Sequence, residues 1–240
     1  MPTSKARHPH VLQRLGAEIA GTFVITLAAI SVDVGYFVGH EVDFVSRWLA
    51  RAFAAAAVIY AFSEISGAHA NPAVTIGFAL RRVFPWGLAG GYIVAQFVGA
   101  LLACGAAWIA FGPALAFGAS RPSPGTPPLV AAACEMVLTA IVMVVILGMA
   151  DNKPAVGKAA AVAVAFAIGA CGFFGGTVSG ASMNPARSVV PDLLAGQFGS
   201  IWIYIVGPLA GAVVAVLLQG ALCGEPSERE RSAALGSDRV

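Results

Sequence analysis

The chain has 240 residues, of which 58% are hydrophobic and only 11% are charged, and its mean hydropathy is +0.83. Soluble globular domains carry about 25% charged residues, so this composition excludes an ordinary water-soluble enzyme, a disordered protein and a collagen-like chain. It indicates an integral membrane protein. The net charge of +2 offers no strongly basic surface for nucleic acid. The four cysteines lack metal-ligand spacing, so we expect no cofactor, no metal and no nucleic-acid partner.

Six runs of the chain are long and apolar enough to be membrane-spanning helices, each of which needs about 20 residues. In chain order they cover residues 13–37, 44–63, 86–111, 129–150, 158–175 and 200–223. Residues 112–128 contain five prolines and are predicted to form a loop. The polar residues 224–240 are predicted to be a disordered cytoplasmic tail.

Six crossings place both ends of the chain on the same side of the membrane. Ten of the 14 basic residues fall on that side, namely Lys5, Arg7, Arg14, Arg81, Arg82, Lys153, Lys158, Arg229, Arg231 and Arg239. Because cytoplasmic loops carry an excess of Lys and Arg, we expect both termini to be cytoplasmic, in a multi-pass protein of the cell's inner membrane.

The two halves of the chain repeat the same motifs in the same order. Residues 66–73 and 179–186 match at six of eight positions, at an offset of 113. Glu18-x-x-x-Thr22 matches Glu135-x-x-x-Thr139, and residues 92–94 match 204–206 as Tyr-Ile-Val. Each half holds three crossings, an odd number, so the halves must be inverted relative to each other. The sequence therefore predicts one domain over 1–240, built from inverted repeats at 11–111 and 129–223, with a transport site at the midplane.

Each repeat contains an Asn-Pro-Ala segment with the signals of a helix start. Asn is a preferred N-cap and Pro is favoured at the first helical position, so two short helices are predicted to begin after the caps, in the segments Asn71-Pro72-Ala73 and Asn184-Pro185-Ala186. The helix from Pro72 to Leu80 would be about 14 Å long, roughly half of a 30 Å hydrocarbon core. One such tripeptide alone would be an ordinary turn, but two in matching apolar contexts predict half-helices that enter from opposite sides and meet at mid-membrane.

Acidic side chains inside membrane helices are functional candidates. Glu18 and Glu135 could carry protons in a transporter, or they could accept hydrogen bonds from the segments before the half-helices. The repeat symmetry favours this supporting role. His69 could shuttle protons, but a pore-lining side chain that forms hydrogen bonds is the favoured interpretation.

With these motifs the chain resembles the major intrinsic protein family of aquaporins and aquaglyceroporins over residues 11–223, and we expect a bacterial member. The resemblance rests on the two Glu-x-x-x-Thr motifs, on Ser-Gly-Ala-His-x-Asn-Pro-Ala-Val-Thr at 66–75, and on Ser-Gly-Ala-Ser-Met-Asn-Pro-Ala-Arg-Ser at 179–188. It implies an all-α membrane protein, an aquaporin-like right-handed bundle of six transmembrane helices with two re-entrant half-helices. It also implies one pore per subunit and a homotetramer in the lipid bilayer.

The resemblance implies a passive channel for water, with small uncharged solutes such as glycerol, urea and metalloid acids as further candidates. Facing half-helix N-termini, the two Asn side chains and Arg187 would exclude protons and cations. The alternative is a secondary transporter, which also uses inverted repeats but needs a charged site at the midplane. A membrane enzyme is disfavoured because the sequence has no nucleophile–base or metal-ligand cluster.

The family's outer selectivity filter corresponds to Arg51, Gly172, Ala181 and Arg187 in this sequence. Water channels of the family have an aromatic residue, a His, a small residue and an Arg there, and glycerol channels usually have two aromatics, Gly and Arg. The two small residues here predict a wide opening, with Trp48 at its rim. Arg51 would repel Arg187 unless an acid neutralises them, with Asp43 and Asp192 nearest in sequence. Alternatively, Arg51 extends to the outer interface.

Overall fold

A computed structural model describes residues 9–37, 42–151 and 158–236, and within these ranges it contains helices and no β-strands. Four of the basic residues counted above, Lys5, Arg7, Lys153 and Arg239, lie outside the described residues. So do residues 237–240 of the predicted tail.

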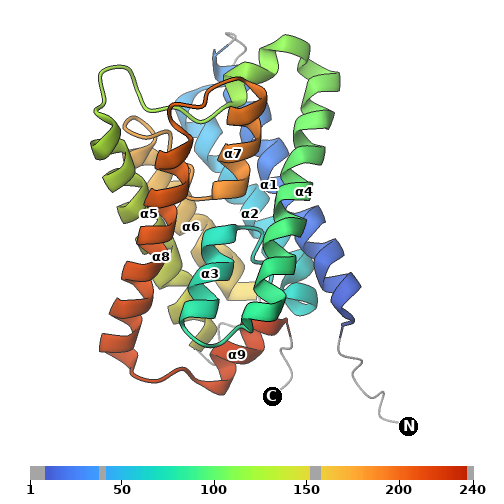
Figure 1. Cartoon of the computed structure of the whole chain (residues 1–240), viewed down its shortest axis with the longest axis vertical. Coiled ribbons are helices and arrows are strands. Elements are labelled where there is room, and N and C mark those ends of the chain that lie inside the picture. The colour runs from blue at the N-terminus through green and yellow to red at the C-terminus, as the bar shows by residue number, and fades with distance from the viewer. Residues whose placement is uncertain (1–8, 38–41, 152–157, 237–240) are drawn as a thin grey trace.

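Long apolar helices form a bundle (Figure 1). Five helices of the described chain have the length and hydropathy of membrane spans: α1 (Val11–Phe37), α2 (Phe44–Ser66), α4 (Trp86–Phe111), α5 (Pro128–Asp151) and α8 (Ile201–Cys223). The remaining predicted crossing is α6 (Lys158–Gly175), whose apolar part, Ala159–Gly175, is shorter. At 1.5 Å per residue, α6 is about 27 Å long. This length is close to the thickness of a membrane's hydrocarbon core, about 30 Å.

Two short helices lie inside the bundle, one toward each end (Figure 1). They are α3 (Pro72–Leu80) and α7 (Pro185–Leu194), and their N-termini point toward each other at mid-height. The side chain of Asn71 accepts a hydrogen bond from the Ala73 amide at 2.9 Å, and that of Asn184 accepts one from the Ala186 amide at 3.1 Å. The predicted N-caps and half-helices are therefore present.

Glycines allow close packing at equivalent places in the two halves. A Cβ atom added at Gly99 of α4 would lie 2.4 Å from the carbonyl oxygen of Ile19 in α1. One added at Gly211 of α8 would lie 2.3 Å from the carbonyl oxygen of Met136 in α5. Because small residues let helix backbones approach in membranes, these two helix pairs hold the acids of α1 and α5 next to the half-helices.

The predicted loop at 112–128 begins with a short 3₁₀ helix, η1 (Gly112–Gly118). The rest of the segment reaches the C-terminal part of α7, where the amide of Ser120 donates to Asp192 at 2.7 Å. This contact brings Ser120 to the half-helix that carries Arg187.

The prediction of a disordered tail is wrong for helix α9 (Glu228–Leu235). Ser227 caps the helix, and a capping box joins Ser227 with Glu230. Glu230 and Ala234 are buried against the bundle. The helix could not be predicted from its polar composition, because only a few of its residues make buried contacts. Those contacts are with residues far away in the sequence.

Candidate pore and selectivity site

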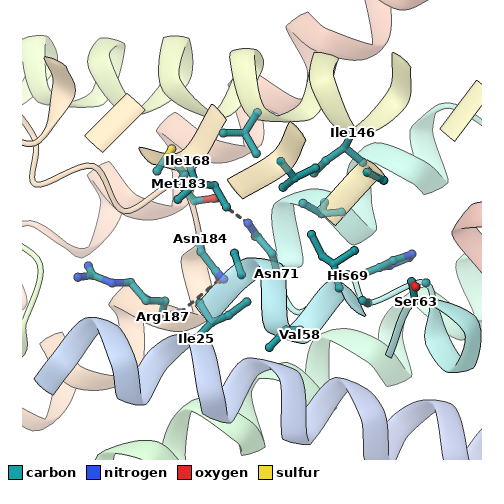
Figure 2. A pocket seen from close by; sticks show the side chains of 18 of the residues that line it. Ile25, Val58, Ser63, His69, Asn71, Ile146, Ile168, Met183, Asn184 and Arg187 are labelled. Carbon is teal, nitrogen blue, oxygen red and sulfur yellow. Dashed lines mark hydrogen bonds between the residues drawn. The ribbon is translucent and has the colours of Figure 1, made fainter. Parts of the chain in front are cut away.

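A cavity of about 150 Å³ is lined by residues at the N-termini of both half-helices, Asn71 and Asn184 among them. Figure 2 shows its polar residues in order: Arg187 at one end, Asn184 and Asn71 in the middle, and His69 with Ser63 at the other end. Apolar side chains from surrounding helices form the remaining wall, among them Ile25, Val58, Ile146 and Ile168. A few polar groups along an apolar wall suit a small polar molecule that exchanges hydrogen bonds as it moves.

The two Asn side chains connect the segments that precede the half-helices. Asn71 Nδ2 donates to the carbonyl of Met183 at 2.8 Å (Figure 2). Asn184 Nδ2 donates to the carbonyl of Ala70 at 2.9 Å. Each side-chain oxygen is used in the helix cap. Because an amide carries two N–H groups, each Asn retains one donor for a molecule in the cavity.

The segments before the half-helices have matching strained backbones. Gly67 and Gly180 have φ values of 83° and 84°. The next residues, Ala68 and Ala181, have φ values of 50° and 43°, and the pair directly before the Asn caps, Ala70 and Met183, has 45° and 55°. The left-handed conformation costs a non-glycine residue roughly 1–2 kcal/mol, and it persists only where surrounding groups hold it.

Glu18 holds the first of these segments. Its carboxylate accepts hydrogen bonds from the Ser66 hydroxyl at 2.7 Å and from the amides of His69 at 3.0 Å and Ala70 at 2.7 Å. The side chain of Gln96 on α4 also donates to it at 2.7 Å. Glu18 is fully buried and is not among the residues that line the cavity.

Glu135 holds the second segment in the same way. It accepts hydrogen bonds from the Ser179 hydroxyl at 2.7 Å and from the amides of Ser182 at 2.8 Å and Met183 at 2.7 Å. It too is fully buried and away from the cavity wall. This geometry supports the loop-holding interpretation of both acids over proton transfer.

Two tyrosines that served only as repeat landmarks in the sequence also hold these segments. The Tyr92 hydroxyl donates to the carbonyl of Ser66 at 2.9 Å, and the Tyr204 hydroxyl donates to the carbonyl of Ser179 at 2.7 Å. The sequence shows that the two tyrosines occupy equivalent positions in the two halves. That equivalence alone does not predict the hydrogen bonds that they form.

Three arginines share one buried carboxylate, Asp33 of α1, at the end of the cavity opposite His69. Arg47 donates to its Oδ1 from Nε at 2.9 Å and from Nη2 at 2.6 Å. Arg187 Nη2 donates to its Oδ2 at 2.8 Å, and Arg51 Nη2 donates to both oxygens. All four side chains are at most 8% exposed.

Two expectations about this end of the cavity are therefore wrong. Arg51 does not extend to the outer interface, since it is buried on Asp33. Within the described residues, neither Asp43 nor Asp192 forms an ion pair with Arg51 or Arg187, which both pair with Asp33. Asp43 caps α2, where hydrogen bonds from Ser46 lower the pKa of its carboxyl, and Asp192 accepts from the amide of Ser120. Nearness in sequence does not identify the partner of Arg51, because the acid that pairs with it lies on the preceding helix. The sequence signal that could have identified this acid is the position of Asp33 within the apolar run 13–37.

Three of the four expected filter residues, Arg51, Ala181 and Arg187, line the cavity, but Gly172 does not. A Cβ atom added at Gly172 would lie 2.1 Å from Cε3 of Trp48. Trp48 is fully buried and does not form a rim, and the guanidinium of Arg51 lies over its ring at 4.3 Å from the centroid. The absence of a side chain at Gly172 thus accommodates Trp48, whose ring supports Arg51.

Arg187 is fixed on its other side by the loop that covers α7. Its Nη1 donates to the hydroxyl of Ser120, which also hydrogen-bonds Ser188. Outside this layer, a second cavity of about 410 Å³ is lined by polar residues that include Asp33, Arg47, Arg121, Thr177 and Arg187. A solute arriving from this side meets a basic entrance before it reaches the narrow cavity. Within the described residues, His, Cys, Asp and Glu side chains form no group of three that could hold a metal ion.

Comparison with known proteins agrees with this arrangement. Residues 5–219 match the family model described as "Major intrinsic protein". The chain is 39% identical over 207 residues to "Aquaporin NIP1-1" of Oryza sativa subsp. japonica, covering 84% of this chain and 71% of that protein. It is 40% identical over 204 residues to "Putative aquaporin NIP4-1" of Arabidopsis thaliana, covering 84% and 71%.

The fold is similar to that of "the aquaglyceroporin from Plasmodium falciparum", with a TM-score of 0.79 and 22% identity over 89% of this chain and 97% of that one. The chain is thus an all-helical, multi-pass membrane protein with the aquaporin fold. It belongs to the major intrinsic protein family, and it is a channel for water and small solutes.

Proposed function

We propose that the chain is a passive channel that conducts water, admits small uncharged solutes such as glycerol, urea or metalloid acids, and excludes protons and ions. The observation that carries this proposal is the meeting of two capped half-helices at Asn71 and Asn184 in the middle of the cavity. No step of this process requires covalent chemistry, so we propose no enzymatic activity.

Proton exclusion follows from charge and hydrogen bonding at the two Asn caps. Each half-helix N-terminus carries roughly half an elementary positive charge, and each Asn amide offers an N–H donor. A water molecule at this point turns its oxygen toward both donors, which leaves it unable to accept a proton from one neighbour and pass it to the next. The arginines at the outer end repel cations before they reach this point.

A secondary transporter is the alternative that the inverted repeats allow. It would require a charged or ion-coordinating site facing the substrate at the midplane. Glu18 and Glu135 lie at that depth, but their oxygens accept hydrogen bonds from the loops and they do not line the cavity. These contacts favour the channel.

The solute range depends on the pair Arg51 and Arg187, which both line the cavity and bind the same carboxylate. We propose that this pair forms the filter together with Ala181, and that it admits solutes larger than water. Stopped-flow light scattering of proteoliposomes with glycerol and urea gradients tests this. Water flow without glycerol or urea flow would contradict the wide filter.

We further propose a homotetramer with both termini in the cytoplasm, in an inner membrane. The excess of basic residues on the side where α1 begins supports the orientation, and the family supports the tetramer. The relatives reported above are plant proteins, so they do not support the bacterial source that we expected. Cysteine labelling from each side of the membrane tests the orientation, and native mass spectrometry tests the tetramer.

A further inference from the structure

The C-terminal helix α9 packs directly against the segment that precedes α3. The carbonyl oxygen of Ala234 accepts a hydrogen bond from His69 Nε2 at 3.0 Å. A Cβ atom at Gly67 would lie only 2.6 Å from that same oxygen. The end of α9 therefore touches the backbone of the first re-entrant segment, and it fixes a side chain that lines the pore cavity.

Helix α9 also contributes to the pore wall itself. Ala233 lines the central cavity together with Gly67, Ala68 and His69. In Figure 1, α9 lies at the end of the bundle where α1 begins, beyond the C-terminal turn of α3. The entrance opposite the arginine filter is thus bounded partly by the C-terminal segment.

A buried ion pair attaches α9 to the end of α3. Arg81 donates from Nε and Nη2 to the two carboxylate oxygens of Glu230, each at 3.2 Å, and from Nη1 to the carbonyl of Gly224 at 2.8 Å. The two side chains are 6% and 1% exposed. Removing one partner of such a pair leaves the other charge buried and uncompensated, so this contact holds α9 in place only while both charges are present.

A second attachment connects the start of α9 to α5. The hydroxyl of Ser227 donates to Asp151 at 2.6 Å. Apart from these contacts and the packing of Ala233, Ala234 and Leu235, α9 presents exposed residues such as Glu228 and Arg231. A short helix held through so few residues can leave while the membrane helices stay folded.

We propose that α9 is a closing segment for the pore entrance at this end: the docked helix restricts flow, and its release from Arg81 and His69 widens the entrance. This inference rests on the proposed channel function. It adds a regulated state in which the C-terminal segment sets the conductance, with the Arg81–Glu230 pair as the contact that controls release.

Two variants with the same change of charge test the proposal in the full chain. Glu230→Gln removes the buried partner of Arg81, whereas Glu228→Gln removes the exposed partner of Arg231 and serves as the control. Water permeability per folded channel is measured by stopped-flow light scattering, and amide hydrogen exchange follows residues 228–236. Glu230→Gln should speed exchange in α9 and raise permeability by at least about fivefold, the lower end of ordinary coupling between sites. Glu228→Gln should change neither.

A chain that ends at Gly224 should show the same increase in permeability. Faster exchange in Glu230→Gln without greater permeability would overturn the closing role while leaving the channel function intact. Wild-type exchange in Glu230→Gln would overturn the role of the ion pair. If neither the wild type nor the truncated chain conducts water, the proposed function itself fails, and this inference fails with it.

Discussion

At the scale of single residues, Asp33 determines the charge and shape of the end of the pore at which Arg187 lies. Its carboxylate forms ion pairs with three arginines. At an effective dielectric of about 20, two guanidiniums roughly 6 Å apart repel each other by about 3 kcal/mol. Arginine does not lose its charge to relieve that repulsion. A shared carboxylate therefore allows Arg51 and Arg187 to face one cavity.

Asp33→Asn should destabilise the protein by about 3–5 kcal/mol, the cost of leaving buried charges without their partner. Thermal unfolding in detergent measures the loss. Asp43→Asn is the matched control, because Asp43 is an exposed N-cap and Asn caps helices about as well as Asp. Equal stability of the two variants would contradict the role of Asp33.

Arg51→Phe should lower glycerol and urea permeability relative to water. The variant replaces one filter charge with an apolar ring beside Trp48, while Asp33 keeps Arg47 and Arg187 as partners. The ratio of solute to water permeability in proteoliposomes is the measurement. An unchanged ratio would mean that Arg51 has no part in the filter and only packs against Trp48.

At the scale of elements, the two half-helices depend on their caps and on the contacts between their leading segments. Asn71→Ala and Asn184→Ala should each cost about 0.5–2 kcal/mol from the lost cap, and each also removes a bond to the opposite segment. Both should reduce water permeability and the unfolding temperature, whereas Cys223→Ser, at an exposed position, should alter neither. Tolerance of all three substitutions would contradict the cap assignment.

The start of α9 provides an independent test of its attachment. Ser227→Asp retains an N-cap side chain but places a carboxylate against Asp151, whereas Ser227→Asn retains the cap without charge. Like charges at that distance repel, so Ser227→Asp should raise water permeability above that of Ser227→Asn. Equal permeability of the two variants would show that the contact with Asp151 does not hold α9.

At the scale of the whole molecule, local signals and internal symmetry predict much of the fold. The Asn-Pro pairs predict where α3 and α7 begin because caps act within a few residues. The contacts of Asp33, Trp48 and Glu230 are not predictable in this way, because each depends on residues from helices that meet only after folding. The repeat indicates which acids are equivalent, but it does not predict the roles of Asp33 and α9, because neither has a counterpart in the other half.

The central claim is that the molecule conducts water while the facing Asn caps interrupt proton transfer. The most direct test loads proteoliposomes with a pH-sensitive dye and measures water flow and proton flow in the same vesicles. The account predicts that the protein raises water permeability well above that of empty vesicles and leaves proton permeability at the empty-vesicle value. Proton flow that rises in proportion to water flow would contradict it.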